Sequence, residues 1–206
     1  MTSLLFDFDG VIADTFELSL STARKRLGHD LEADYYRDFF NGNIYKHDKV
    51  GEKNWENWEE DPFFKIQIPQ LNDQPIFDGM TKIIETLSKN HVLHIVSSSP
   101  SKPIQDYLKL NQVDSYFDQI LGADVDTDKF RKIQSIIDGN GHHPHQMLFV
   151  TDTVGDVKEA LNCDVRSKAE TWGFHQKHRL DDVGAHAVVE SPRELENEIQ
   201  QYFSQL

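Results

Sequence analysis

The chain alternates between short continuous apolar runs and stretches in which apolar residues recur every three or four positions. A short run predicts a strand that is buried on both faces, and the longer spacing predicts an amphipathic helix. The runs are 4–8, 92–97, 119–123, 147–152 and 185–190. The helical spacings lie in 80–87, 104–108, 130–137, 154–161 and 195–203. Strands that alternate with helices are typical of a parallel sheet covered on both faces, so the pattern predicts an α/β fold.

One long stretch interrupts this alternation. Apolar residues at positions 16, 20, 23 and 27 predict a helix directly after the first strand. Residues 28–75 are then rich in charged and aromatic residues and contain no continuous strand-like run, and the turn-rich sequence QLNDQPIFDG (70–79) marks their far boundary. We therefore expect a mostly helical insertion over 16–75, in a core formed by 1–15 and 76–206.

Composition narrows the possible partners and location. The 206 residues carry a formal net charge of −14, which disfavours general binding to nucleic acid, because that requires a basic surface. The only cysteine, Cys163, rules out an internal disulfide and fits a reducing compartment. The N-terminal stretch does not resemble a signal peptide, and no apolar run is long enough to span a membrane. We expect a cytoplasmic protein that binds neither nucleic acid nor membrane, and that meets any anionic substrate with a local cation or metal.

Polar residues follow the predicted strands at their carboxyl ends, where open parallel sheets bind ligands. They are Asp7, Asp9, Ser97, Ser98, Asp152 and Asp156, with Lys129 after the third run. The spacing of Asp7 and Asp9 places both carboxylates on one face of a strand, where they repel each other. We expect a cation between these two aspartates, or a proton on one of them.

The carboxylates, hydroxyl groups and lysine expected at this edge are suited to one type of reaction. Carboxylates are hard oxygen ligands that suit Mg²⁺. Hydroxyl groups, the backbone N–H groups at a helix start and a lysine bind phosphate oxygens. A free carboxylate beside the metal can act as a nucleophile, and a second one as acid and base. Together they predict phosphoryl transfer through an aspartyl-phosphate, with the metal and the lysine stabilising the transition state.

Four sequence motifs resemble those of a known superfamily. DFDGVIADT, IVSSS, Lys129 and VTDTVGD occur in the order of the four motifs of the haloacid dehalogenase-like superfamily. Segments 1–15 and 76–206 carry the resemblance. The insertion has the position and approximate size of the cap in the branch that contains phosphoglycolate phosphatase and β-phosphoglucomutase. The resemblance implies a three-layer, doubly wound parallel sheet of the Rossmann type, with a small helical cap domain (16–75) inserted after the first strand.

The resemblance also implies roles for the four aspartates. Asp7 would be the nucleophile that becomes phosphorylated, and Asp9 would protonate the leaving oxygen and then activate water. Asp152 would bind Mg²⁺ together with Asp7 and the Asp9 carbonyl, and Asp156 would assist directly or through water. Dehalogenases and phosphonate hydrolases of the superfamily lack an aspartate two residues after the nucleophile, so Asp9 argues against both of these activities.

The resemblance assigns the phosphoryl group to Ser97, Ser98 and Lys129, and the chain departs from the family pattern at two places. The family usually has glycine where this chain has Thr151, whose side chain is expected to crowd the site. The family lysine is usually followed by proline, which is absent here. Lys132 is therefore an alternative to Lys129, although its place one turn into the helix favours Lys129.

The aromatic residues of the insertion have helical spacing, so core packing of the cap explains most of them. One ring is nevertheless expected to face the substrate, and the sequence does not select which. The candidates are Tyr35, Tyr36, Phe39, Phe40, Trp55 and Trp58.

The function expected from these observations is that of a Mg²⁺-dependent phosphatase acting on a small phosphorylated metabolite, as a monomer or homodimer. A sugar phosphomutase of the same branch shares all four motifs and is the first alternative, although the insertion shows no basic signature typical of a mutase cap. The second alternative is a non-catalytic binding protein that has kept the fold. The complete set of carboxylates argues against it.

Overall fold

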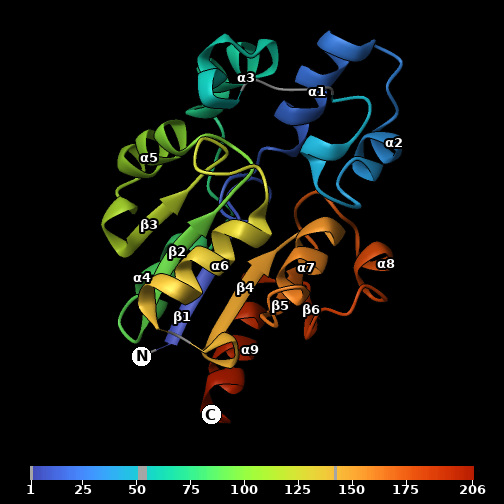
Figure 1. The fold of residues 1–206 in the computed structure, drawn as a ribbon. Helices are drawn as coiled ribbons and strands as arrows, with labels where there is room; N and C mark the ends of the chain where they lie inside the picture. Colours follow the sequence, from blue (N-terminus) through green and yellow to red (C-terminus); the bar gives the residue numbers. More distant parts are fainter. Residues whose placement is uncertain (1, 51–54, 142) are drawn as a thin grey trace.

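The computed structural model describes residues 2–50, 55–141 and 143–206 and contains a six-stranded parallel sheet (Figure 1). The strands are β1 (Thr2–Phe6), β2 (His91–Val96), β3 (Phe117–Leu121), β4 (Met147–Thr151), β5 (Arg166–Glu170) and β6 (Ala187–Val189). Their order in the sheet is β3-β2-β1-β4-β5-β6. Phe6 of β1 pairs with Ile95 of β2 and with Val150 of β4. The three central strands therefore end at the same edge of the sheet.

Helices cover both faces of the sheet and form the outer two of three layers. They are α4 (Met80–Leu87), α5 (Ser101–Leu110), α6 (Lys129–Asn140), α7 (Val154–Leu161), α8 (Lys177–Leu180) and α9 (Pro192–Ser204), with short 3₁₀ turns η3 (Asp114–Tyr116) and η4 (Pro144–Gln146). Leu4 and Phe6 of β1 pack in one apolar cluster with α4, α5 and α9, whereas Leu5 packs in a second cluster with α6 and α7. Because neighbouring strand residues point to opposite faces, the continuous apolar run of β1 is buried on both sides. The predicted α/β fold class is confirmed.

One strand of the sheet has no counterpart among the predicted strands. β5 has the sequence RSKAE, which contains no apolar run, yet all but its first residue are buried. The Lys168 ammonium is paired with the Glu198 carboxylate of α9 at 2.6 Å, so its charge is compensated inside the fold. Hydrophobic pattern does not detect such a strand. In contrast, the predicted strands 4–8 and 119–123 extend beyond the observed ends of β1 and β3. Phe8 and Ala123 are apolar and buried but lie outside the paired strands, so the apolar run overestimates the length of each strand.

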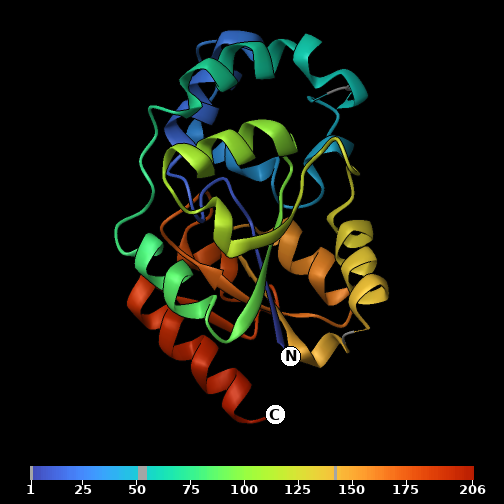
Figure 2. The same cartoon turned by 90° about the vertical axis from the view of Figure 1, so that its left-hand side faces the viewer.

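The insertion lies over the carboxyl edge of the sheet (Figure 2). Its elements are α1 (Phe16–Leu27), α2 (Ala33–Asp38), η1 (Ile44–Lys46), η2 (Trp55–Glu60) and α3 (Pro62–Leu71), and its described residues include no strand. Apolar residues of the insertion, including Phe16, Tyr36 and Phe39, form a cluster with Phe174 from the connection between β5 and α8. The insertion therefore packs against the core, and its behaviour as a separate domain stays a prediction. Within the described ranges, no helix has both the length and the apolar composition needed to cross a membrane.

Candidate active site

The loop after β1 places Asp7 and Asp9 at the carboxyl edge of the sheet. The Asp7 N–H donates to the Val150 carbonyl at 2.9 Å, so the chain follows β4 for one residue beyond the strand. Gly10 then adopts a φ of 79°, and a Cβ atom there would lie 2.1 Å from Asp152 Oδ2. Only glycine fits this turn, because a side chain would strain the backbone and displace the Asp152 carboxylate.

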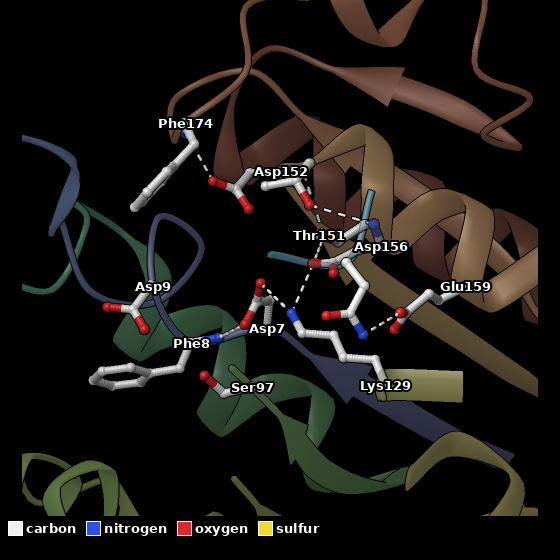
Figure 3. A network of polar contacts seen from close by, with 12 residues as sticks. Asp7, Phe8, Asp9, Ser97, Lys129, Thr151, Asp152, Asp156, Glu159 and Phe174 are labelled. Atoms are coloured by element: carbon white, nitrogen blue, oxygen red, sulfur yellow. Dashed lines mark hydrogen bonds and ion pairs between the residues drawn. The ribbon is translucent and has the colours of Figure 1, made fainter. Parts of the chain in front are cut away.

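Lys129 joins two of the carboxylates (Figure 3). Its Nζ lies 2.6 Å from Asp7 Oδ2 and 2.7 Å from Asp156 Oδ2, and all three residues are buried. Burial raises the pKa of Asp7 well above its ordinary value, and the charge of Lys129 opposes this rise. Burial would lower the pKa of Lys129, but the attraction of Asp156 and Asp7 outweighs it and raises that pKa. The lysine therefore carries its charge in the site.

Asp9 has different partners from Asp7. Its two carboxylate oxygens accept hydrogen bonds from the hydroxyl groups of Thr15 and Ser99, at 2.8 and 2.5 Å. Burial raises the pKa of Asp9, and these two donors partly offset the rise. The expectation of a cation between the two aspartates, or of a proton on one of them, stays a prediction, and Lys129 pairs with Asp7 and Asp156. The expectation that both carboxylates lie on one face of a strand is wrong, because β1 ends at Phe6 and both aspartates lie beyond it.

Asp152, directly after β4, completes a group of three buried carboxylates. Asp7, Asp152 and Asp156 each offer an oxygen atom, and these atoms lie within 4.8 Å of one another. Asp152 Oδ2 accepts the Phe174 N–H at 2.7 Å, whereas its buried Oδ1 has no hydrogen-bond partner in the described part of the chain. Burial raises the pKa of Asp152 to about 7, although the Phe174 N–H opposes the rise. A buried carboxylate oxygen without a donor, beside two further carboxylates, is an environment that a bound cation would stabilise.

Asp156 lies in the first turn of α7, where two donors hold one of its oxygens. Thr151 Oγ1 donates to Asp156 Oδ2 at 2.7 Å, and Lys129 donates to the same oxygen. Thr153 caps the helix by accepting the Asp156 N–H at 3.4 Å. Burial alone would raise the pKa of Asp156, but the charge of Lys129 and the hydrogen bonds lower it. Thr151 thus contributes a hydrogen bond, where the sequence led us to expect crowding.

Ser97 follows β2 and contacts Lys132, one of the two candidate lysines of α6. Ser97 is fully buried, and its carbonyl accepts a hydrogen bond from Lys132 Nζ at 2.6 Å. Lys132 also donates to the Gly122 carbonyl at 3.3 Å. Burial, together with the charge of Lys129, lowers the pKa of Lys132 to about 8. Lys129 therefore contacts the carboxylates, and Lys132 contacts the backbone of the loops around them.

The insertion reaches the site through two residues that the sequence does not single out. The Tyr45 O–H donates to the Ser98 carbonyl at 2.5 Å. The side-chain amide of Asn43 donates to Asp128 Oδ1 and to Glu159 Oε1, at 2.7 and 2.9 Å. Both residues lie in the segment NGNIY, whose composition is typical of a loop and carries no sign of long-range contacts.

A pocket lies between the insertion and the carboxylates. Its core lining includes Asp7, Asp9, Ser98, Lys129 and Asp156. Of the aromatic candidates, Tyr36, Phe39 and Phe40 line the pocket, whereas Tyr35 and Trp58 do not. The side chain of Trp55 lies outside the described residues. The structure thus brings most of the predicted site residues to one pocket and identifies three rings that face it.

Comparison with known proteins identifies the family. The sequence profile of the haloacid dehalogenase-like hydrolases matches residues 4–169, which include all four motifs. The chain is 24% identical to the phosphoglycolate phosphatase of Synechococcus elongatus over 100% of both chains, and 22% identical to the pyrophosphatase PpaX of Bacillus mycoides over 95% of both. Its fold is similar to that of a predicted phosphatase from Clostridium acetobutylicum, with a TM-score of 0.81 and 20% identity over 97% of this chain and 98% of the other. Because the profile spans most of its length, the chain belongs to the haloacid dehalogenase-like hydrolase family.

Proposed function

We propose that this hydrolase is a phosphatase, which releases phosphate from a small phosphorylated metabolite through an aspartyl-phosphate formed on Asp7. The observation that carries the proposal is that two aspartates of one pocket have different partners. Asp7 is paired with Lys129, whereas hydroxyl groups hold Asp9. The names of the two relatives, a phosphoglycolate phosphatase and a pyrophosphatase, also support hydrolysis of a phosphoryl group.

In the proposed reaction, Asp7 is the nucleophile and Asp9 moves the protons. A carboxylate oxygen of Asp7 attacks phosphorus, and the bond between phosphorus and the leaving oxygen breaks. Asp9 gives its proton to that oxygen, and its raised pKa, caused by burial, supports a protonated state before the reaction. The Asp9 carboxylate then takes a proton from water. The water oxygen attacks phosphorus, inorganic phosphate leaves, and the Asp7 carboxylate is regenerated.

Binding of the phosphoryl group is assigned to Lys129, Ser97 and Ser98. The chain has a formal net charge of −14, so an anionic group needs local positive charge. Lys129 supplies a buried positive charge next to Asp7. The two serines follow β2 at the same edge of the sheet and are proposed to contribute hydroxyl and N–H donors as charge develops in the transition state.

The buried carboxylates fit Mg²⁺. If all of them were ionised, Asp7, Asp152 and Asp156 would leave two negative charges uncompensated by Lys129, and Asp152 Oδ1 has no donor among the described residues. A ligand set made only of oxygen atoms matches the preference of magnesium. We assign the ion to Asp7, Asp152 and the Asp9 carbonyl, with Asp156 assisting. When bound, Mg²⁺ would stabilise the negative charge on the phosphoryl oxygens.

Residues 16–75 are proposed to form a cap domain, with 1–15 and 76–206 supplying the chemistry. A cap that covers the site excludes water from the reaction and opens for exchange of substrate and product. The contacts of Asn43 and Tyr45 with the core support this role, because they join the insertion to the loops beside Lys129 and Ser98.

The proposed substrate is a small molecule in a reducing compartment such as the cytoplasm. Cys163 is a free thiol, which fits such a compartment. The acidic composition favours a small phosphorylated substrate over nucleic acid. A monomeric or homodimeric state stays a prediction.

A panel of phosphorylated metabolites assayed with Mg²⁺ tests the proposal, with Asp7→Asn as the control. We expect wild-type protein to release inorganic phosphate and the variant to release none. Product analysis separates hydrolysis from transfer to a second substrate, which is the outcome for a phosphomutase. If the protein turns over no phosphomonoester, including p-nitrophenyl phosphate, the proposal is wrong and a non-catalytic binding protein is favoured.

A further inference from the structure

The pocket extends away from the carboxylates along one face of α1. Ser19, Ala23, Arg26 and Leu27 all line it, and their spacing places them on the same side of the helix. A helix rises by about 1.5 Å per residue, so the distance along α1 from Ser19 to Leu27 is about 12 Å. This wall is longer than a two-carbon leaving group requires.

The wall between the two ends of the pocket is mainly apolar. The aromatic and aliphatic lining residues include Tyr36, Phe39, Phe40, Ile44, Phe63 and Phe64. Tyr36 packs edge to face on Phe39 and Phe40, with ring centroids 5.5 and 5.3 Å apart. A leaving group with an apolar body would gain both burial and ring contacts along this wall.

Among its described residues, the insertion adds positive charge to the pocket and no negative charge. Arg26 and Lys49 line the pocket and are exposed, and neither has an ion-pair partner among the described residues. The lining carboxylates (Asp7, Asp9, Asp156 and Glu159) all belong to the core. None of the described acidic residues of the insertion lines the pocket, although this segment is rich in them. In an acidic chain, two unpaired cations in a pocket wall favour an anion.

We infer that the substrate is a phosphomonoester whose leaving group has an elongated apolar body and ends in a second anionic group, bound by Arg26 and Lys49. The inference rests on the proposed function, because Asp7 and Lys129 position the phosphoryl end of such a molecule. The apolar body lies along the aromatic wall. The second anion reaches the end of the pocket at which α1 presents Arg26.

Linear alkyl phosphates of increasing chain length, each with and without a terminal carboxylate, test this inference. We expect the ratio of kcat/KM for the carboxylate ester to that for the uncharged ester of equal length to rise with chain length. Arg26→Gln and Lys49→Gln are each expected to lower the highest ratio roughly fivefold at low salt, as the loss of an exposed charge pair predicts. Lys25→Gln is the matched control, because this exposed lysine neighbours Arg26 and does not line the pocket. It should leave the ratio unchanged.

Two outcomes overturn the inference while leaving the proposed function intact. The first is hydrolysis with a ratio that does not depend on chain length, and the second is an equal ratio in wild type and both pocket variants. If neither these esters nor p-nitrophenyl phosphate is hydrolysed, the proposed function fails instead. Calorimetry with the corresponding phosphonates then measures binding to the pocket without turnover. The inference holds only if their affinity depends on chain length, on the terminal carboxylate and on Arg26 as described for kcat/KM.

Discussion

The Thr151 hydroxyl donates a hydrogen bond to Asp156 Oδ2 over 2.7 Å, on the oxygen that also accepts from Lys129. Thr151 is the last residue of β4 and is fully buried. The strand end thus fixes the orientation of a carboxylate that belongs to the following helix. Where the resemblance to the superfamily led us to expect glycine, this chain supplies a donor to a residue of the proposed metal site.

Thr151→Val keeps the shape of the side chain and removes the donor. Loss of a hydrogen bond to a buried charged group costs about 1.5–3 kcal/mol, so we expect a fall of roughly tenfold or more in kcat/KM. Thr151→Ser keeps a hydroxyl group and should stay close to wild type. Steady-state kinetics with p-nitrophenyl phosphate compare the two variants. Equal activity of both would show that the hydrogen bond does not contribute.

Asp7→Asn should abolish turnover without unfolding the protein, because it removes the proposed nucleophile and keeps the side-chain shape. Asp9→Asn should still bind substrate and lose about 10²–10⁴ in kcat, the usual contribution of acid–base catalysis. Phosphate release and circular dichroism, measured on both variants, check these outcomes. Activity of Asp7→Asn above a few per cent of wild type would exclude the aspartyl-phosphate.

The metal-free protein should lose stability as pH rises from about 4 to about 7. Burial raises the pKa of Asp152 to about 7, whereas an aspartate in an unfolded chain titrates at about 3.9. In this window the folded state keeps a proton that the unfolded state releases, so the free energy of unfolding falls as pH rises. The raised pKa of Asp7 acts in the same direction. Thermal unfolding in the presence of a chelator measures the trend, and Asp152→Asn should flatten it.

The same experiment with Mg²⁺ tests the metal site. The ion binds ionised carboxylates, so its stabilising effect on Tm should grow over this pH range. Chelator should suppress activity, and Ca²⁺ should restore it poorly, because a larger ion with flexible coordination fits in-line transfer less well. Full activity in excess chelator would mean that the carboxylates do not form a metal site. The same conclusion would follow if Mg²⁺ raised the Tm of Asp152→Asn with the pH dependence seen in wild type.

Lys129 and Lys132 allow a matched comparison of two buried lysines on α6. Lys129→Met removes the charge that compensates Asp7 and Asp156, so we expect kcat to fall by orders of magnitude. Lys132 donates to the carbonyl groups of Ser97 and Gly122, so Lys132→Met should lower Tm and affect kcat much less. Kinetics and thermal unfolding of both variants separate these effects. A larger loss of kcat in Lys132→Met would reverse the assignment.

The candidate site was predictable from the sequence where local pattern determines it. Asp7 follows an apolar run that is buried on both faces, and Gly10 marks the turn, so both aspartates could be placed at a strand end. Their partners could not be deduced in the same way. Ser99, which holds Asp9, is 90 positions away in the chain, and only the folded sheet brings the two together.

The strands whose buried residues are apolar were predictable from the sequence. β5 was missed because its buried Lys168 is compensated by Glu198 on the last helix, an interaction with no periodic signature. The contacts of Asn43 were missed for a related reason, since a loop amide acquires its partners from the tertiary structure. Charge and hydrogen-bond partners across the fold therefore account for most of what pattern alone does not predict.

Phe63 and Tyr35 provide the test of whether the insertion selects the substrate. Both are aromatic residues of the insertion, but Phe63 lines the pocket, whereas Tyr35 does not and is 46% exposed. The core holds the phosphoryl group, so a change in the pocket wall should act through the leaving group. We expect Phe63→Ala to lower kcat/KM by about tenfold for long apolar leaving groups, as pocket contacts worth about 1–3 kcal/mol predict, and by less for a minimal aryl phosphate.

Tyr35→Ala is the control for this comparison, and it should leave kcat/KM unchanged across the whole panel. The decisive quantity is the spread of kcat/KM ratios between variant and wild type over many substrates, with Tm measured on each protein. If Phe63→Ala lowers kcat/KM by one common factor for every substrate while Tm stays at the wild-type value, the insertion does not discriminate between leaving groups. Selection between leaving groups would then lie in core residues that line the pocket, such as Glu159 and Phe174.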